Sequence, residues 1–248
     1  MHNYYLGFKF MISYFTVFPV KFKTEDDLSS PAVLSAMLFW LPFAGLILGS
    51  IILGLYLSLE KLGWFAALIA AAAYPMLYGF LHTEAVMDVA DALYAKHSGK
   101  DAYAIIKDPT VGAMGVLWAT GVFLLKTAGI AYLLLHQYFT LLLALFMLSR
   151  MGLLLLLFTQ SFRSSFLTAL KAGFTLTSFT ASVVLFSLMG LLLTGVSFFL
   201  LLVMALSLSY LIARYLSRQL GFMNGDILGT TLEATEIILL IAGALLWL

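Results

Sequence analysis

Residues 137–158 read QYFTLLLALFMLSRMGLLLLLF, and Arg150 is the only charged side chain among them. A helix needs about 20 apolar residues to cross the hydrocarbon core of a bilayer. Further long apolar runs cover residues 34–58, 63–81, 112–134, 173–195, 197–215 and 230–248. We therefore predict an all-α, polytopic membrane protein with about seven transmembrane helices, folded as a single domain over residues 1–248.

The composition supports this class. The 248 residues are 63% hydrophobic and only 10% charged, and the mean hydropathy is +1.06, which is far outside the range of soluble domains. A net charge of +1 argues against binding to nucleic acid through bulk basicity. The absence of cysteine excludes disulfides, thiolate zinc sites and iron–sulfur clusters.

The N-terminal segment is less regular than the runs. Residues 4–20 are aromatic and moderately apolar, so we expect an interfacial or re-entrant helix there. They lack a compact apolar core with a small-residue cleavage site, and we expect no cleaved signal peptide. Ser30 and Pro31 are typical of a helix start, with a serine cap and proline in the first turn. Pro42, Gly45 and Pro75 indicate kinks or close helix contacts within the first two runs.

The basic residues predict the orientation. An odd number of crossings puts the two termini on opposite sides, and only Lys61 and His136 fall clearly on the far side. The N-terminal side carries Lys9, Lys21, Lys23, Lys96, Lys100, Lys107, Arg163, Lys171, Arg214 and Arg218. By the positive-inside rule, that side is predicted to be the cytoplasmic side of the inner (plasma) membrane.

Residues 82–110 are too polar to cross and are expected to form a helix and loop at one membrane surface. Glu84, Asp88 and Asp91 lie at positions i, i+4 and i+7, so one helical face carries all three. Oxygen ligands without cysteine favour Mg²⁺, Mn²⁺ or Ca²⁺ over zinc. The spacing predicts a polar cup that binds a metal, and the alternative is a solvated helix whose acids face water.

The last apolar run adds a second acidic face. Asp226, Glu233 and Glu236 lie at i, i+7 and i+10, and an acid inside an apolar run is costly unless it faces a hydrated or metal-filled interior. Alternatives are the hydrated funnel of a transporter, or carboxylates hydrogen-bonded to neighbouring helices. The candidate metal ligands are therefore Glu84, Asp88, Asp91, Asp226, Glu233 and Glu236.

Three further polar residues fall within or beside the apolar runs. The guanidinium fork of Arg150 suits phosphate, or else a structural ion pair with a buried acid. Lys126 lies deep in the third run and is expected to extend toward the outer surface. His82 projects roughly opposite Glu84 if the helix is regular, and the alternative is that it precedes the helix at the mouth of the cup.

The order of these residues resembles the family of cobalamin 5′-phosphate synthase, also called adenosylcobinamide-GDP ribazoletransferase. The family pattern F-H-L-D-G-L-A-D-x-x-D-G is similar to LHTEAVMDVADA at 81–92. The pattern I-M-K-D-S-R-x-G-x-x-G is similar to IIKDPTVGAMG at 105–115, and G-D-x-L-G-A-x-x-E-x-x-E to GDILGTTLEATE at 225–236. The departures from the family pattern are Glu84 for Asp, Ala85 and Ala92 for Gly, and Pro109 and Thr110 for Ser and Arg.

The resemblance implies a Mg²⁺-dependent transferase of late cobalamin assembly. Such an enzyme joins adenosylcobinamide-GDP to α-ribazole, or to its 5′-phosphate, and releases GMP. The resemblance implies catalytic roles for His82, Asp88, Asp91 and Asp108, and substrate-binding roles for Lys107, Arg150 and Asn224. The partners expected are these substrates and the lipid bilayer, without nucleic acid.

Two alternatives also place acidic residues in membranes: another membrane transferase, of the CDP-alcohol or prenyl class, and a transporter. CDP-alcohol transferases need D-G-x-x-A-R followed by G-x-x-x-D-x-x-x-D, which does not occur in the sequence, and prenyltransferases expect N-D-x-x-D motifs in two related helices. A carboxylate-lined transporter would place its site near the midplane, commonly within internal repeats. The acids here crowd one face without a repeat, which favours the transferase.

Overall fold

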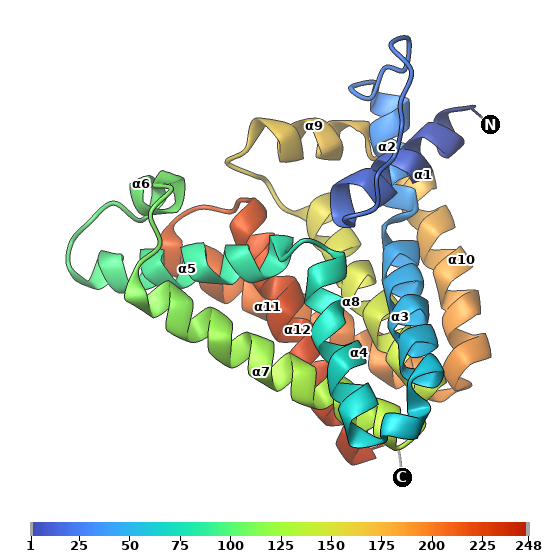
Figure 1. The fold of residues 1–248 in the computed structure, drawn as a ribbon. Coiled ribbons are helices and arrows are strands. Elements are labelled where there is room, and N and C mark those ends of the chain that lie inside the picture. Colours follow the sequence, from blue (N-terminus) through green and yellow to red (C-terminus); the bar gives the residue numbers. More distant parts are fainter. Residues whose placement is uncertain (1, 247–248) are drawn as a thin grey trace.

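The structure is a computed structural model that describes residues 2–246, and all of their regular structure is helical (Figure 1). The helices in order are α1 (His2–Phe15), α2 (Pro31–Phe39), α3 (Leu41–Ser58), the 3₁₀ turn η1 (Glu60–Leu62), α4 (Trp64–Leu77), α5 (Leu81–His97), α6 (Ala102–Lys107), α7 (Ala113–Leu135), α8 (Phe139–Thr159), α9 (Ser165–Gly173), α10 (Leu176–Thr194), α11 (Ser197–Leu220) and α12 (Gly225–Leu246).

The long helices form a membrane bundle around α8. Within the described chain, six helices are long and apolar enough to cross a bilayer: α3, α7, α8, α10, α11 and α12. The bent pair of α4 and α5 is the seventh candidate. In the most apolar 18-residue stretch of α8, 83% of the residues are buried inside the protein, against 17% in the corresponding stretch of α10. Helix α8 is therefore the central helix, and α10 faces lipid. The predicted all-α polytopic fold with about seven crossings is confirmed.

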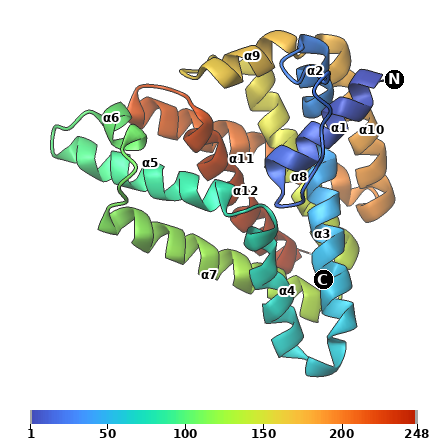
Figure 2. The same ribbon diagram turned by 45° about the horizontal axis from the view of Figure 1, so that its top comes forward.

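A sharp bend separates α4 from α5. Gly79 and Phe80 have positive φ angles of 63° and 57°, a conformation that ends the helical path. The axis of α5 then turns by 75° and lies across α12 beside α7 (Figure 2). The prediction of a polar helix and loop over residues 82–110 is confirmed by α5 and α6. Because α5 carries Glu84, Asp88 and Asp91, the bend determines where these acids lie.

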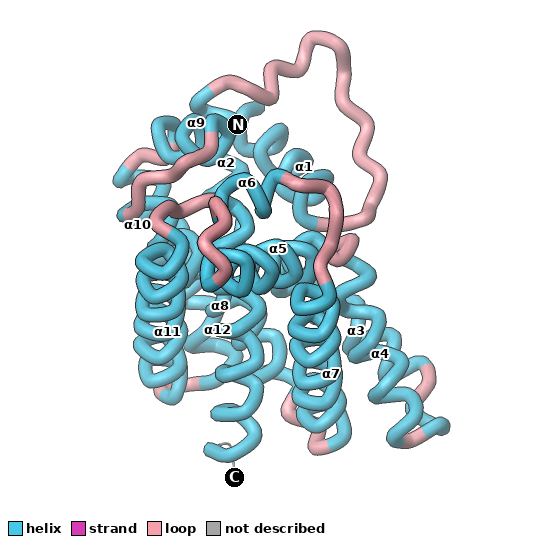
Figure 3. The backbone as a smooth tube through the Cα atoms, turned by 90° about the vertical axis from the view of Figure 1, so that its left-hand side faces the viewer, coloured by secondary structure: helices cyan, strands magenta, loops and turns pink. Residues whose placement is uncertain are grey.

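The short helices gather at one end of the bundle. Figure 3 shows α1, α2, α5, α6 and α9 at the end opposite the last turn of α12. The N-terminal helix and the end of α12 therefore lie at opposite ends of the molecule, as an odd number of crossings requires. Helix α9 was not predicted, because its nine residues are too few to give a clear apolar run.

Several predicted boundaries differ from the structure. The first run is broken at Trp40 into α2 and α3, and α12 begins at Gly225 rather than at residue 230. The helix start at Pro31 is confirmed, but the side chain of Ser30 makes no capping hydrogen bond. The close helix contact predicted at Gly45 is confirmed, since an added Cβ would lie 2.3 Å from the carbonyl oxygen of Phe146. Residues 247–248 of the last predicted run lie outside the described residues.

Candidate functional site

Helices α5 and α12 cross at two small residues. An added Cβ at Gly229 would lie 2.6 Å from the Cβ of Ala85, so α12 needs glycine at this position. One residue further, the hydroxyl of Thr230 donates a hydrogen bond to the carbonyl oxygen of Ala85 at 2.9 Å. The first turn of α12, which carries Asp226, is thereby fixed against the part of α5 that carries Glu84 and Asp88.

We call Glu84, Asp88 and Asp226 the acidic face. Glu84 is exposed, and Asp88 and Asp226 are half-buried. Burial, reinforced by the charges of Asp226, Glu84 and Asp91, raises the pKa of Asp88 to about 6, and Lys107 opposes this shift. None of the ion pairs formed within residues 2–246 involves the acidic face. The three carboxylates therefore repel one another without a bonded cation, which is an arrangement suited to a divalent ion.

Asp91 lies on the same helix but has a different environment. Its two oxygens accept hydrogen bonds from the backbone N–H groups of Gly112, at 2.6 Å, and Gly115, at 2.7 Å. Helix α7 begins at Ala113, so Asp91 caps this helix from another element, and its charge is stabilised by the helix dipole. An added Cβ at Gly112 or Gly115 would lie 2.6 or 2.5 Å from an Asp91 oxygen. The two glycines therefore let the helix end reach the carboxylate.

Asp108 also receives local hydrogen bonds. Its Oδ1 accepts from the backbone N–H of Thr110 at 2.9 Å and from the Thr110 hydroxyl at 2.6 Å, and these bonds lower the pKa of Asp108. Asp91, Asp108, Thr110 and Gly112 line a surface hollow of about 360 Å³ beside α6. The structure thus brings Asp91 and Asp108 together in this hollow, apart from the acidic face.

Asn224 is buried and caps α12. Its Oδ1 accepts from the backbone N–H of Ile227 at 3.1 Å, and its Nδ2 donates to Oδ2 of Asp226 at 2.7 Å. Asn224 therefore orients the carboxylate of Asp226. Its predicted contact with substrate stays a prediction.

The remaining predicted acids belong to a second group, which we call the buried charge cluster: Lys126, Arg150, Glu233 and Glu236. Lys126 Nζ lies 2.7 Å from Glu233 Oε2 and 2.6 Å from Glu236 Oε2. Arg150 Nη1 lies 2.6 Å from Glu236 Oε1. All four residues are at most 2% exposed, so two cations and two anions neutralise each other inside the bundle.

Two tyrosines four residues apart, Tyr74 on α4 and Tyr78 directly after it, donate hydrogen bonds to the buried charge cluster. Tyr78 donates to Glu233 at 2.6 Å, and Tyr74 donates to Glu236 at 3.1 Å. Neither tyrosine was predicted as a site residue, although their spacing at i and i+4 in an apolar run is a signal in the sequence. Buried ionic groups need such additional hydrogen bonds to offset desolvation.

The six predicted metal ligands therefore do not form one cup. Among the described residues, no three His, Cys, Asp or Glu side chains converge as metal ligands, and Glu233 and Glu236 are satisfied by Lys126 and Arg150. The expectation that Lys126 extends to the surface is wrong, because two carboxylates at its own depth balance its charge. For Arg150, the structure contains the structural ion pair that was the alternative to phosphate binding.

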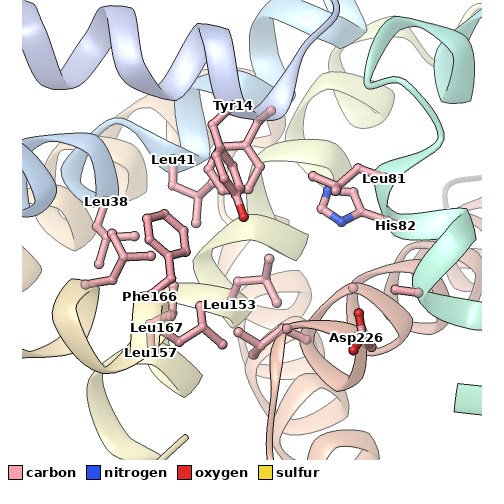
Figure 4. A pocket seen from close by; sticks show the side chains of 16 residues that line it. Tyr14, Leu38, Leu41, Leu81, His82, Leu153, Leu157, Phe166, Leu167 and Asp226 are labelled. Carbon is pink, nitrogen blue, oxygen red and sulfur yellow. The ribbon is translucent and has the colours of Figure 1, made fainter. Parts of the chain in front are cut away.

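His82 is buried and lines an apolar cavity. Its ring is 6% exposed, stacks on Phe15 with centroids 6.3 Å apart, and is tilted against Tyr78. Together with Asp226 it lines a cavity of about 150 Å³, whose other walls are mostly leucines (Figure 4). Because α5 begins at Leu81, His82 lies within the helix and does not precede it, and both His82 and Asp226 line the cavity.

The fold and these groups define a polytopic helical membrane protein with an acidic face at one end of its bundle and a neutral charge cluster inside it. The chain belongs to the cobalamin-5-phosphate synthase family (CobS), which matches residues 7–244. The family resemblance seen in the sequence is therefore confirmed.

Several curated relatives are called adenosylcobinamide-GDP ribazoletransferase. The relative from Chlorobium chlorochromatii is 37% identical over 119 residues, which is 47% of each chain. The one from Pelodictyon phaeoclathratiforme is 33% identical over 138 residues, covering 54% of this chain and 52% of the relative. One from Clostridium perfringens is 34% identical over 134 residues, covering 52% and 51%. The matched part thus spans about half the length of these relatives. No solved structure matches the chain.

Proposed function

We propose that this protein is a Mg²⁺-dependent transferase that joins adenosylcobinamide-GDP to α-ribazole, or to its 5′-phosphate, and releases GMP. Membership of the family, and the activity after which its relatives are named, support this assignment. The observation that carries it is the acidic face itself. Carboxylates from α5 and α12 meet there without a paired cation, within the field of Lys107.

The acidic face fits Mg²⁺ bound together with a diphosphate. Mg²⁺ prefers oxygen ligands, keeps several waters, and is held by one or two protein carboxylates plus substrate phosphates rather than by an all-protein cage. The lack of three converging side chains within residues 2–246 agrees with that mode. We assign Glu84 and Asp226 as the residues that would hold the ion. When bound, Mg²⁺ neutralises charge on the diphosphate as the leaving phosphate departs.

The chain must also accept one proton. The ribazole hydroxyl oxygen forms a bond to the phosphorus attached to cobinamide, the bond from that phosphorus to the GMP oxygen breaks, and the hydroxyl proton is released. Among the candidate bases, Asp91 and Asp108 have oxygens already held by hydrogen bonds. The carboxylate of Asp88 has no such bond among the described residues, so we assign the proton to it.

The other predicted residues receive different roles. We assign Lys107, which is exposed and electrostatically coupled to Asp88 and Asp226, to the diphosphate. His82, which lines the cavity beside Asp226, is placed to contact the acceptor nucleoside. Arg150 and Glu236 act through the buried charge cluster, which positions α8 against α12.

We further infer that the acidic face opens to the cytoplasm. It lies at the same end of the bundle as the N-terminal helix, where the sequence places most lysines and arginines. The positive-inside rule assigns such an end to the cytoplasm.

The test is GMP release by the full-length protein in lipid nanodiscs, given adenosylcobinamide-GDP, α-ribazole and Mg²⁺. We expect Asp88→Asn to lower kcat about 10²-fold or more, as for loss of a general base. Asp27→Asn is the matched control, because Asp27 is an exposed carboxylate in the loop before α2 and accepts its hydrogen bonds from Ser29. Wild-type protein that releases no GMP contradicts the function, and an active Asp88→Asn variant removes Asp88 from the mechanism.

A further inference from the structure

The 150 Å³ cavity beside the acidic face is lined mostly by apolar side chains and has few polar ones. It lies among α1, α2, α3, α5, α8, α9 and α12, and leucines from six of these helices make up half of its lining residues. Tyr14, His82 and Asp226 are its main polar side chains (Figure 4). An occupant would therefore be apolar over most of its surface and polar at the end that faces Asp226.

The cavity is covered by aromatic rings from two short helices. Tyr14 at the end of α1 stacks on Phe166 of α9, with centroids 5.3 Å apart and an interplanar angle of 29°. Tyr14 is 42% exposed, so this cover lies at the surface of the bundle. A lining of aromatic rings and leucine side chains favours a flat aromatic ligand.

The size of the cavity restricts the occupant further. An apolar cavity of about 150 Å³ lined by leucine and phenylalanine is large enough for a benzene ring, and the exposed position of Tyr14 leaves it open at the surface to the second ring of a bicyclic base. A corrin ring or a whole nucleotide does not fit in that space. Guanine is also unsuitable, because its carbonyl and amino groups would lose their hydrogen bonds against leucine walls.

We propose that this cavity binds the benzimidazole base of α-ribazole, with the ribose directed toward Asp226 and the acidic face. The proposal rests on the proposed function, which supplies a nucleoside with an apolar bicyclic base as the acceptor. This placement puts the ribose hydroxyl on the side of the cavity where Asp226 and, one helix away, Asp88 lie. The cavity is then a specificity pocket, and the acidic face is the place of reaction.

The first test measures the KM of each substrate separately in nanodiscs. Leu167→Phe inserts a ring into the wall and is expected to raise the KM for α-ribazole about tenfold, with the KM for adenosylcobinamide-GDP unchanged. Leu192→Phe is the matched control, since Leu192 is 88% exposed on α10. A rise in the KM for adenosylcobinamide-GDP instead of α-ribazole would overturn the proposal.

A second test does not depend on turnover. Equilibrium dialysis with free 5,6-dimethylbenzimidazole should show saturable binding to the wild type and to Leu192→Phe, and about tenfold weaker binding to Leu167→Phe. Tyr14→Ala, at the exposed cover, should also weaken binding in a folded protein. Equal binding by all four proteins would place the base elsewhere. Wild-type protein that binds the base but releases no GMP would contradict the proposed function and leave the pocket supported.

Discussion

The carboxylate of Asp91 on α5 lies 2.6 Å from the backbone nitrogen of Gly112, and through this bond it caps the start of α7. The Asp91 side chain thus joins the polar surface helix to a membrane-spanning helix. An aspartate that seemed to belong to a metal cup has a structural function that accounts for the glycines after Asp108.

Gly115→Ala tests this cap. The new Cβ would lie 2.5 Å from an Asp91 oxygen and 2.8 Å from the carbonyl oxygen of Met87, so we expect the free energy of unfolding to fall by about 1–3 kcal/mol. Gly121→Ala on the same helix is the control, because nothing lies within 4 Å of its added Cβ. That substitution should be neutral or stabilising by up to ~1 kcal/mol. Equal effects in chemical denaturation would argue against the cap.

The close crossing of α5 and α12 can be tested with a single variant and a compensating double variant. Gly229→Ala places a Cβ 2.6 Å from that of Ala85, so the helices must separate and GMP release should fall at least tenfold. The double variant Ala85→Gly with Gly229→Ala removes the clash and should recover most of the activity. Failure of the rescue would mean that the distance between these helices does not control the acidic face.

The buried charge cluster is predicted to stabilise the fold rather than to bind metal. Lys126→Met leaves Glu233 and Glu236 with one cation fewer, and removing one partner of a buried pair costs about 3–5 kcal/mol. Thermal unfolding in nanodiscs measures this loss. Glu233→Gln should leave the Mg²⁺ concentration needed for half-maximal activity unchanged. A large increase in that concentration would return Glu233 to the metal site.

The pH dependence of stability reports on Asp88. Because the folded pKa is raised from 3.8 to about 6, the stabilising contribution of its protonated form is complete below pH 3.8 and is lost as the pH rises through 6. In EDTA, the Tm of the wild type should therefore fall relative to that of Asp88→Asn between pH 4 and 7. Parallel Tm profiles of the two proteins would show that the pKa of Asp88 is not raised in the folded protein.

The sequence predicted which segments are helices better than it predicted which side chains of different helices contact each other. Runs of apolar residues determine which segments cross a bilayer, so the number of crossings and the polar surface helix were predictable. Lys126 and Glu233 are 107 positions apart, and their pairing depends on how α7 and α12 rotate in the bundle. The spacing of residues within one helix predicts which of them share a face. It does not predict which residue of another helix packs against that face.

For the same reason, the six predicted metal ligands were not recognised as two separate groups. Glu84, Asp88 and Asp226 meet because small residues allow α5 to lie on α12, and the spacing alone placed Glu233 and Glu236 with them. The depth of a carboxylate in the bundle separated the two groups: exposed or half-buried acids remain without a cation, whereas fully buried ones are paired. Tyr14 and Phe166, which cover the cavity, come from segments whose sequence carries no comparable signal.

In the proposed mechanism, the acidic face holds the Mg²⁺ that accompanies the diphosphate. The most direct measurement is a Mg²⁺ titration of GMP release by the wild type and by Asp226→Asn, with Asp27→Asn as control. We predict no release in EDTA and a half-maximal Mg²⁺ concentration at least about tenfold higher for Asp226→Asn than for the other two proteins. Release of GMP in EDTA would show that the reaction does not need Mg²⁺. The same Mg²⁺ dependence in all three proteins would show that Asp226 of the acidic face does not hold the ion.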